Sequence, residues 1–156
     1  MQTFLPYPDY EESAFCLDRR RLGKQRVEVL QLLKTFMPSY QSKAWINHPA
    51  RLMWKNYTIS LAYYGLVVCK EWVIRGYRDT CYDKIVEIIF EHCKIGKPQD
   101  YDDSLKVIKS MEIKPHWLGR EDFHASHRSN LLRKDPIWYG RYGWNESPDL
   151  PYVWPT

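Results

Sequence analysis

The sequence predicts an all-α protein: a compact single domain over residues 1–156, with three main helices and an ordered, aromatic-rich C-terminal extension. Apolar residues recur at steps of three and four along most of the chain, which is the period of an amphipathic helix. No segment alternates apolar and polar residues long enough to indicate a strand, and no internal repeat is visible. A chain of 156 residues can bury one core but is too short for two.

The beginning of the chain predicts an arm followed by a helix. Residues 1–8 contain two prolines, which favours an extended arm lying on the body of the protein. Asp9 followed by Glu12 is a variant of the capping box. A helix is therefore expected to start near Tyr10 and to continue into residues 17–36.

Residues 17–36 form the centre of the predicted fold. Apolar residues line one face, and the opposite polar stripe consists of Arg21, Lys24, Gln25, Glu28 and Gln31. Positive charge concentrated around one carboxylate is typical of a surface that binds an anion and acts on it, and a solvated face with ordinary salt bridges is the alternative. Gly23 costs about 1 kcal/mol relative to alanine inside a helix, so it predicts a bend or a close approach of a ligand.

The middle of the chain predicts two further helices. Residues 47–49 have the pattern of a helix start, with a cap residue and a proline in the first turn, and the helical period continues to Tyr77. Another helix is expected to begin at Thr80. Residues 94–104 are polar and contain glycine and proline, which predicts a loop, and a second break is predicted at residues 114–117.

The C-terminal part predicts one shorter helix and an irregular tail. The helix spans residues 121–135 and is expected to end before Pro136. The following tail is interrupted by glycines and prolines, so it is expected to contain no regular element and to lie against the body or a ligand. Its aromatic residues are Trp138, Tyr139, Tyr142, Trp144, Tyr152 and Trp154.

Composition favours a nucleic acid partner. The net charge is +4, and the positive charge collects toward both ends because residues 79–103 hold seven acids and three lysines. Aromatic residues make up 15% of the chain. Cations bind phosphates and rings stack on bases, so basic ends with interleaved aromatics suit a nucleic acid. Aromatic residues that simply fill a core are the alternative.

The four cysteines and the absence of long apolar runs indicate the compartment. The cysteines form no CxxC pair and do not resemble a secreted disulfide scaffold, so reduced thiols are expected. No signal-like or membrane-spanning segment is visible. We therefore expect a cytoplasmic protein with no membrane partner, associated with the nucleoid or located in the cytoplasm of a host cell if the protein is viral. We also expect it to be a monomer.

Glu28 and His48 are the first candidates for chemistry. Neighbouring cations favour the charged form of Glu28, which is then able to stabilise a developing cation or accept a proton. An ordinary helix salt bridge explains Glu28 equally well. His48, at a helix start, is placed to meet a phosphate or a sugar hydroxyl, although a simple cap is the alternative.

A second cluster lies between residues 116 and 134. His127 and Arg128 share one helical turn with His124, and Lys134 follows two turns later, which indicates a phosphate-binding face. A metal pair at His124 and His127 lacks a third ligand with suitable spacing, so a metal site is not expected there. No P-loop, GxGxxG, GxSxG or HExxH motif is present to support nucleotide hydrolysis or the common hydrolase mechanisms.

Three segments, taken in order, resemble a divergent branch of the pyrimidine dimer DNA glycosylase family, whose members are similar to phage endonuclease V. The segments are residues 20–22 in the first long helix, residues 47–77, and residues 135–143 with their PIWY and YG pattern. The resemblance implies a helical domain that kinks damaged duplex DNA and attacks the sugar C1′ with its N-terminal α-amine. An imine (Schiff base) forms, the base is lost and β-elimination nicks the strand, without a metal or an organic cofactor.

The chain departs from the family pattern at two positions. The family nucleophile is an N-terminal threonine exposed by removal of the initiator methionine, but position 2 here is Gln, so Met1 is expected to stay and to supply the amine. The slot of the family's catalytic glutamate holds Arg21 here. Glu28 lies about 10 Å further along the helix at 1.5 Å per residue, and it is the candidate substitute.

These considerations assign residues to a glycosylase with AP lyase activity on damaged or modified pyrimidines. Met1 and Glu28 are expected to be catalytic. The expected DNA-binding residues are Arg20, Arg21, Lys24, Gln25, His48, His127, Arg128, Lys134, Trp138, Tyr139 and Tyr142. Two alternatives remain open: a non-catalytic binder of distorted or modified nucleic acid, and an enzyme that uses His48, His127 and Glu28 as acid and base on a nucleotide or RNA.

Overall fold

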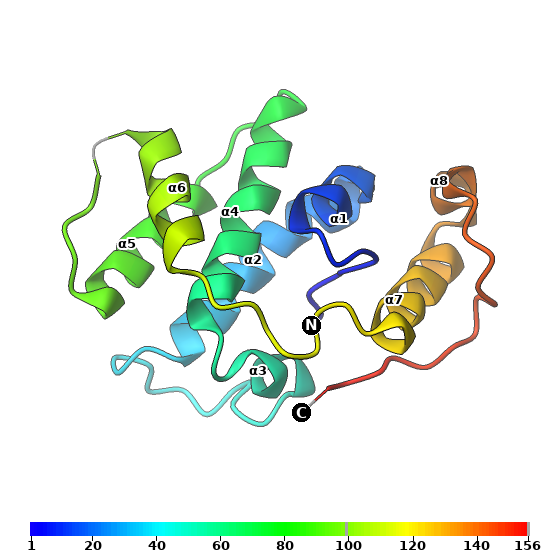
Figure 1. The fold of residues 1–156 in the computed structure, drawn as a ribbon, viewed down its shortest axis with the longest axis horizontal. Helices are drawn as coiled ribbons and strands as arrows, with labels where there is room; N and C mark the ends of the chain where they lie inside the picture. The colour runs from blue at the N-terminus through cyan, green and yellow to red at the C-terminus, as the bar shows by residue number, and fades with distance from the viewer. Residues whose placement is uncertain (99, 156) are drawn as a thin grey trace.

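The computed structural model describes residues 1–98 and 100–155, and it describes only the backbone of residue 101. Within this part the chain forms eight α-helices, one 3-10 turn and no strand, so the all-α prediction is confirmed (Figure 1). The elements are α1 (Tyr10–Cys16), α2 (Arg19–Thr35), α3 (Pro49–Trp54), α4 (Thr58–Ile74), α5 (Cys81–Cys93), α6 (Tyr101–Met111), α7 (Glu121–Lys134), α8 (Pro136–Tyr139) and the 3-10 turn η1 (Gly140–Tyr142). None of these helices is long and apolar enough to span a membrane.

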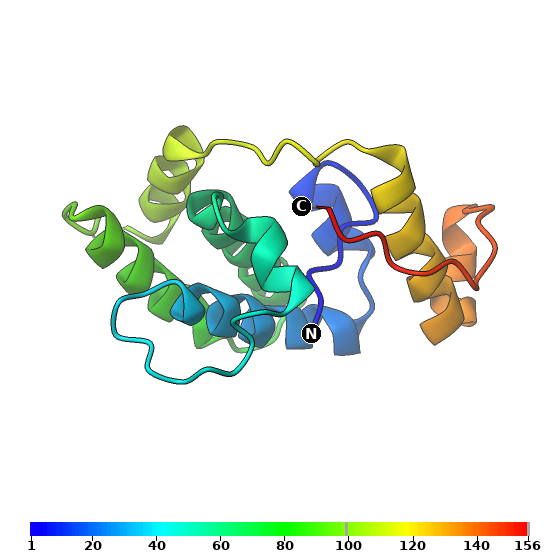
Figure 2. The ribbon, with the colours of Figure 1, turned by 90° about the horizontal axis from the view of Figure 1, so that it is seen from below.

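Helix α4 lies at the centre of the core. All ten residues from Ser60 to Cys69 are buried, as expected of a helix that is covered on every side. Helices α1, α2, α5 and α6 all contact it. Helices α7 and α8 pack on the other side of the N-terminal arm (Figures 1 and 2). The C-terminal segment returns along α7, where the hydroxyl of Ser129 accepts a hydrogen bond from the Leu150 N–H at 3.0 Å.

Gly65 permits the close packing of α4 against α2 and α5. A Cβ at this position would lie 2.5 Å from Val29 Cγ1 and 3.0 Å from Ile85 Cδ1. Overpacking a core lowers the stability by about 1–3 kcal/mol. Alanine has a higher helix propensity than glycine, which raises the stability by about 1 kcal/mol. We therefore expect Gly65→Ala to lower the free energy of unfolding, measured by urea denaturation, by up to about 2 kcal/mol.

Two variants control this prediction. Gly140→Ala places a methyl group where nothing lies within 4 Å, so it should leave the stability unchanged. The double variant Gly65→Ala, Val29→Ala should lose less stability than the sum of the two single variants, because truncating Val29 relieves the contact. Strictly additive losses would contradict this explanation.

Several predicted boundaries are confirmed. Asp9 caps α1 by accepting a hydrogen bond from the Glu12 N–H at 2.9 Å. His48 caps α3 through its ring, which accepts from the Ala50 N–H, and Pro49 follows in the first turn. The shorter helix predicted at residues 121–135 is α7, which ends one residue earlier.

The prediction of continuous long helices is wrong at two places. Leu17 and Asp18 are extended, so α1 and α2 are separate helices. Tyr57 leaves the helical conformation and separates α3 from α4. Gly23 produces no break, since α2 continues through it; a Cβ there would lie 3.0 Å from the ring of Trp72, so a neighbouring helix makes the close approach.

Two regions are more regular than predicted, and they add shorter elements to the main helices. Helix α6 begins inside the loop predicted at residues 94–104, where Asp100 accepts from the Asp102 N–H at 2.8 Å; residue 99 of that loop lies outside the described residues. The tail contains α8 and η1. Asp135 caps α8 by accepting from the Trp138 N–H at 3.0 Å.

Candidate functional site

The N-terminal arm runs between α2 and α7 and is held by buried side chains. Gln25 on α2 uses both ends of its amide: Nε2 donates to the Gln2 carbonyl at 2.7 Å and Oε1 accepts from the Phe4 N–H at 2.9 Å. Tyr64 on α4 donates its hydroxyl to the Phe4 carbonyl at 2.7 Å. Gln25 is 1% exposed and positions the arm, and its contact with DNA stays a prediction.

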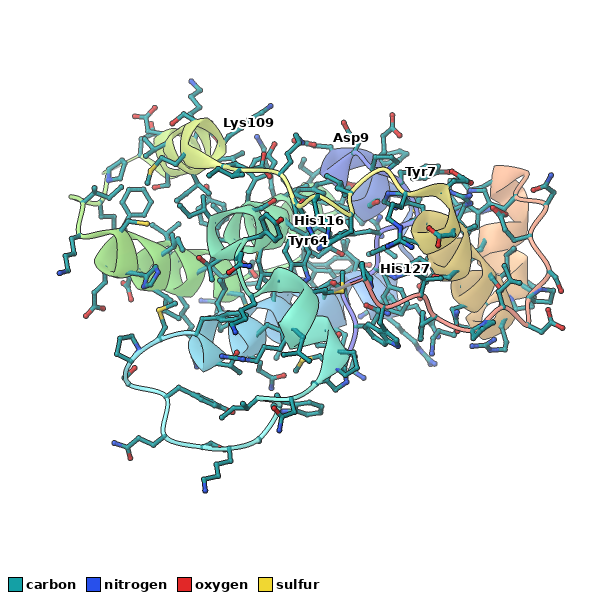
Figure 3. The ribbon with its side chains drawn as sticks, turned by 60° about the horizontal axis from the view of Figure 1, so that its bottom comes forward. Tyr7, Asp9, Tyr64, Lys109, His116 and His127 are labelled. Atoms are coloured by element: carbon teal, nitrogen blue, oxygen red, sulfur yellow. The ribbon has the colours of Figure 1, made fainter. Side chains whose placement is uncertain are left out.

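Helix α7 holds the same arm from the opposite side. His127 Nδ1 accepts a hydrogen bond from the Leu5 N–H at 2.9 Å, and His124 Nδ1 lies 2.7 Å from the Leu5 carbonyl. His124 Nε2 accepts from the Gly119 N–H at 2.9 Å, which places its proton on Nδ1. Both rings are fully buried, and Figure 3 places His127 in the interior with Tyr64. In this structure His127 is buried against the arm, and its contact with DNA stays a prediction.

Burial makes His127 a source of acid sensitivity. Burial lowers the pKa of His127 to about 3, whereas an unfolded histidine titrates near 6.5. The unfolded state therefore binds a proton below about pH 6.5 that the folded state does not bind, and stability falls as the pH decreases. Between pH 7 and pH 4.5 this one residue should cost about 2–3 kcal/mol of unfolding free energy.

The comparison of unfolding free energies at pH 7 and pH 4.5 checks this prediction. His127→Gln should reduce the dependence on pH by that amount, whatever its own stability at pH 7. His92→Gln is the matched control because His92 is exposed, and it should retain the dependence of the parent protein. An unchanged dependence in His127→Gln would contradict the assignment.

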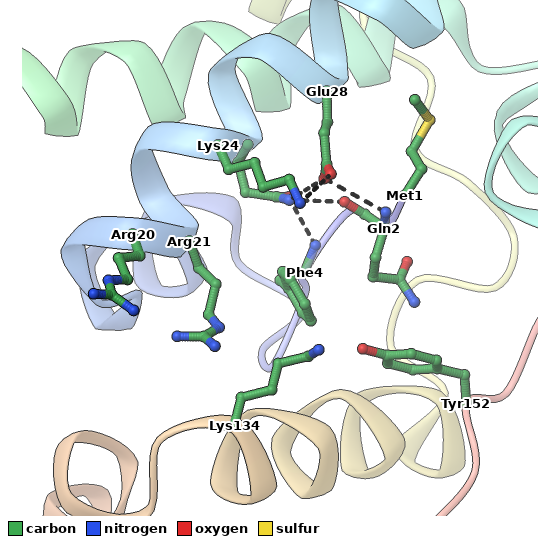
Figure 4. Close-up of a pocket in the computed structure, with 10 residues that line it drawn as sticks. Met1, Gln2, Phe4, Arg20, Arg21, Lys24, Glu28, Lys134 and Tyr152 are labelled. Carbon is green, nitrogen blue, oxygen red and sulfur yellow. Dashed lines mark hydrogen bonds and ion pairs between the residues drawn. The ribbon is translucent and has the colours of Figure 1, made fainter.

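A pocket of about 300 Å³ opens beside the N-terminal residues. Helix α2 forms one wall, and Lys134 from α7 and Tyr152 from the C-terminal segment lie opposite (Figure 4). The lining residues are Met1, Gln2, Phe4, Arg20, Arg21, Lys24, Gln25, Glu28, Lys134 and Tyr152. The sequence analysis did not assign Gln2, Phe4 or Tyr152 to the site, although it expected the tail that contains Tyr152 to lie against the body or a ligand.

Glu28 is the carboxylate of this pocket. It is 8% exposed, and its Oε2 accepts from Gln25 Nε2 at 3.0 Å and from the Gln2 N–H at 3.5 Å (Figure 4). Lys24 Nζ lies 3.8 Å from Oε1. Arg21, in the slot assigned to the family glutamate, instead pairs with Asp18 at 3.0 Å. The predicted substitute carboxylate therefore lies beside the first two residues of the chain.

Four cations border the pocket: Arg20, Arg21, Lys24 and Lys134. Burial lowers the pKa of Lys134 from its usual value, and the nearby charges of Arg21, Arg133 and Lys24 lower it further. These groups repel one another in the free protein, and an anion between them would relieve that repulsion. His48 lies close enough for the N-terminal amine to lower its pKa, although burial is the larger cause.

Arg128 is a structural residue in this fold. Its guanidinium donates to Glu146 and Glu121, and NH1 donates to the Pro6 carbonyl at 2.8 Å. The residue is 9% exposed. Arg128 thereby joins α7 to the arm and to the C-terminal segment, and its contact with DNA phosphates stays a prediction.

The three aromatic residues predicted to press on DNA lie away from the pocket. Tyr139 is fully buried, with its hydroxyl hydrogen bonded to Asp18, so it is structural. Trp138 and Tyr142 line a separate hollow of about 710 Å³ together with Arg19. Arg141 lies 3.9 Å over the Trp138 ring. The contact of Trp138 and Tyr142 with DNA stays a prediction.

Together these features define an all-α protein with a pocket that is bordered by four cations and brings a carboxylate to the first residues of its chain. The family model for pyrimidine dimer DNA glycosylase matches residues 1–85, more than half of the chain. The protein therefore belongs to the pyrimidine dimer DNA glycosylase family of DNA repair proteins, and DNA is the substrate that this membership implies. The match includes the α2 wall of the pocket but not Lys134 or Tyr152. No curated protein and no solved structure matches the chain.

Proposed function

We propose that the protein is a DNA glycosylase with associated AP lyase activity, which removes a damaged or modified pyrimidine from duplex DNA. The α-amine of Met1 is the nucleophile and Glu28 is the assisting carboxylate. One observation carries this proposal: Met1 and Glu28 line the same pocket, with Glu28 Oε2 3.5 Å from the next backbone nitrogen along the chain. An α-amine is roughly two pKa units less basic than a lysine side chain, so more of it is unprotonated near neutral pH.

The proposed reaction has three steps: formation of the imine with loss of the base, β-elimination of the 3′ phosphate, and hydrolysis of the imine. The unprotonated amine attacks C1′ and the bond from C1′ to the base breaks, so the base leaves with the electron pair and takes up the proton that the attacking nitrogen releases. The bond from C1′ to the ring oxygen then breaks, the oxygen takes a proton from solvent, and the protonated imine remains. Loss of a C2′ proton then expels the 3′ phosphate by β-elimination, and water finally hydrolyses the imine. Glu28 stabilises the cationic intermediate or accepts a proton, which typically contributes about 10²–10⁴-fold.

The cations around the pocket bind the DNA backbone in this proposal. Arg20, Lys24 and Lys134 reach the pocket from α2 and α7, so they are placed to contact phosphates on both sides of the reacting sugar. Lys24 combines a side-chain exposure of 75% with an ion pair to Glu28. The alternative enzyme with His48, His127 and Glu28 as acid and base gains no support, because His127 is buried and bonded to Leu5.

Borohydride trapping on duplex DNA with an abasic site tests the proposal. The intact mass is measured first, because the nucleophile must carry a free α-amine. Peptide mapping should then place the covalent adduct on Met1, and acetylation of the α-amine should abolish it. A duplex with a tetrahydrofuran site, which cannot form an imine, is the matched control and should give no adduct.

Each other outcome overturns a defined part of the proposal. An adduct on Lys134 or Lys24 would support the imine mechanism but would show that a lysine side chain, not the α-amine of Met1, is the nucleophile. An adduct on Gln2 in a chain without Met1 would move the nucleophile by one residue. Salt-dependent binding without any adduct would overturn the lyase activity and favour a non-catalytic binder.

A further inference from the structure

A row of four rings leads from the pocket to the surface. Tyr152 lines the pocket. Its ring centroid lies 5.5 Å from that of Trp154, Trp154 lies 5.9 Å from His48, and His48 lies 5.4 Å from Trp45. The last two contacts are edge-to-face, so each ring supports its neighbour without a gap for an intercalated group. No part of this row except His48 entered the sequence-based assignment.

Trp45 ends this row as an exposed side chain on a constrained backbone. It is 44% exposed and has a φ of +67°, a left-handed conformation that a bulky residue rarely adopts. The His48 N–H donates to the Trp45 carbonyl at 3.0 Å, and the Tyr40 hydroxyl donates to the Ala44 carbonyl. A strained backbone conformation persists only where the surrounding contacts hold it in place, and such conformations are common at functional sites.

The row is connected to the proposed reacting centre. Its inner end, Tyr152, shares the pocket with Met1 and Glu28. Burial lowers the pKa of its third ring, His48, and the charge of the N-terminal amine lowers this pKa further. Any DNA strand bound with its sugar in the pocket therefore has an aromatic surface beside it that extends to solvent.

We propose that Trp45 is a stacking platform for an unpaired nucleobase of the bound DNA, and that His48 and Trp154 fix its position relative to the pocket. This inference rests on the proposed function only in taking DNA as the ligand. Exposed rings bind bases of any sequence through their π faces, and cations nearby hold the backbone. Lys43, two residues before Trp45, is exposed and is the nearest cation along the loop.

The spacing of the rings limits which base stacks on Trp45. Three steps of 5.4–5.9 Å separate the rings of Tyr152 and Trp45, so at about 3.4 Å per nucleotide the stacked base lies within about five nucleotides of the reacting sugar. The base on Trp45 is thus a neighbour of the lesion, and Trp45 contributes to binding without touching the reacting atoms.

The test uses the full chain and a duplex with a tetrahydrofuran abasic site, which binds without chemistry. The fluorescent base 2-aminopurine is placed at each of the five positions on either side of that site, in either strand. At one position or more, binding should quench its fluorescence, and Trp45→Gly should remove the quenching. The same variant should raise Kd about 5- to 100-fold, which corresponds to the loss of one base stack.

Two further variants keep the test decisive. Glycine readily adopts a φ of +67°, so Trp45→Gly should have the same thermal unfolding midpoint as the parent protein. If that midpoint falls, the test is repeated with Trp45→Asn, because asparagine also tolerates this conformation. Leu52→Ala removes a similarly exposed apolar side chain from α3 and should leave Kd within about twofold. A Kd within twofold for Trp45→Gly, or no quenching at any position, overturns the stacking role.

The stacking role and the proposed reaction fail in different ways. Covalent trapping at Met1 combined with an unaffected Trp45→Gly would overturn only the stacking platform. Loss of affinity and quenching in Trp45→Gly without any trapping would overturn only the imine chemistry. Absence of DNA binding by the parent chain would overturn both.

Discussion

Replacing Glu28 with glutamine is expected to reduce turnover of an abasic-site duplex by about 10²–10⁴-fold, while Kd for DNA changes by less than about threefold. Glutamine has nearly the same shape and can still accept hydrogen bonds from Gln25 and from the Gln2 N–H. It cannot accept a proton or balance a cationic intermediate. The lost ion pair with Lys24 is 3.8 Å long and largely exposed on the lysine side, so it contributes little to binding.

Single-turnover kinetics and a separate binding titration measure the two effects independently. Glu91→Gln is the control, since Glu91 is exposed on α5, and it should leave both rate and affinity unchanged. Equal losses of rate and affinity in Glu28→Gln would mean that Glu28 only positions the arm or the DNA. An unchanged rate would remove Glu28 from the reaction.

Arg128→Met is expected to lower the free energy of unfolding by about 3–5 kcal/mol, a loss typical of a buried ion pair that loses one partner. The substitution leaves the Glu146 carboxylate, which has only 12% side-chain exposure, without its cation. It also removes the donor to the Pro6 carbonyl. Because Arg128 joins three segments, the arm, α7 and the C-terminal segment should loosen together.

Chemical denaturation measures the loss, and Lys134→Met provides the contrast on the same helix. Lys134 is exposed at the pocket, so its loss should leave the unfolding free energy within about 0.5 kcal/mol. It should instead weaken DNA binding and reduce the salt dependence by about one phosphate contact. If Arg128→Met is as stable as the parent protein but binds DNA more weakly, the result would support the phosphate contact of Arg128 that the sequence predicts.

Local sequence signals predicted the helix starts but not every boundary. Caps at Asp9 and His48 act within a few residues, so a single sequence is sufficient to find them. The interruptions at Leu17 and Tyr57 depend on how α1, α2 and α3 pack around α4, which the helical period cannot show. Helix α6 was missed because its short capped segment follows glycine and proline, which normally indicate a loop.

The sequence was sufficient to group the residues that line the pocket from α2, but not to recognise the residues that bind the arm. Arg20, Arg21, Lys24 and Glu28 share one stripe of α2, so their proximity follows from helical geometry. His127 contacts Leu5 across 122 positions of sequence. A polar side chain that binds a distant backbone has the same local pattern as one that faces a ligand, and this is why His127 and Arg128 were assigned to DNA.

The arrangement of the arm has a consequence for the order of folding during synthesis. Leu5 is synthesised long before α7, yet both hydrogen-bonding partners of its backbone, His124 and His127, belong to α7. Until α7 emerges, the Leu5 N–H and carbonyl have only water as a partner, and the pocket lacks the wall that Lys134 provides. Closing so long a loop is slow, because its entropy is lost before the contact is gained. In a nascent chain the backbone of Leu5 therefore stays exposed to solvent until α7 has been made, and the pocket that Lys134 completes forms as one of the last events of folding.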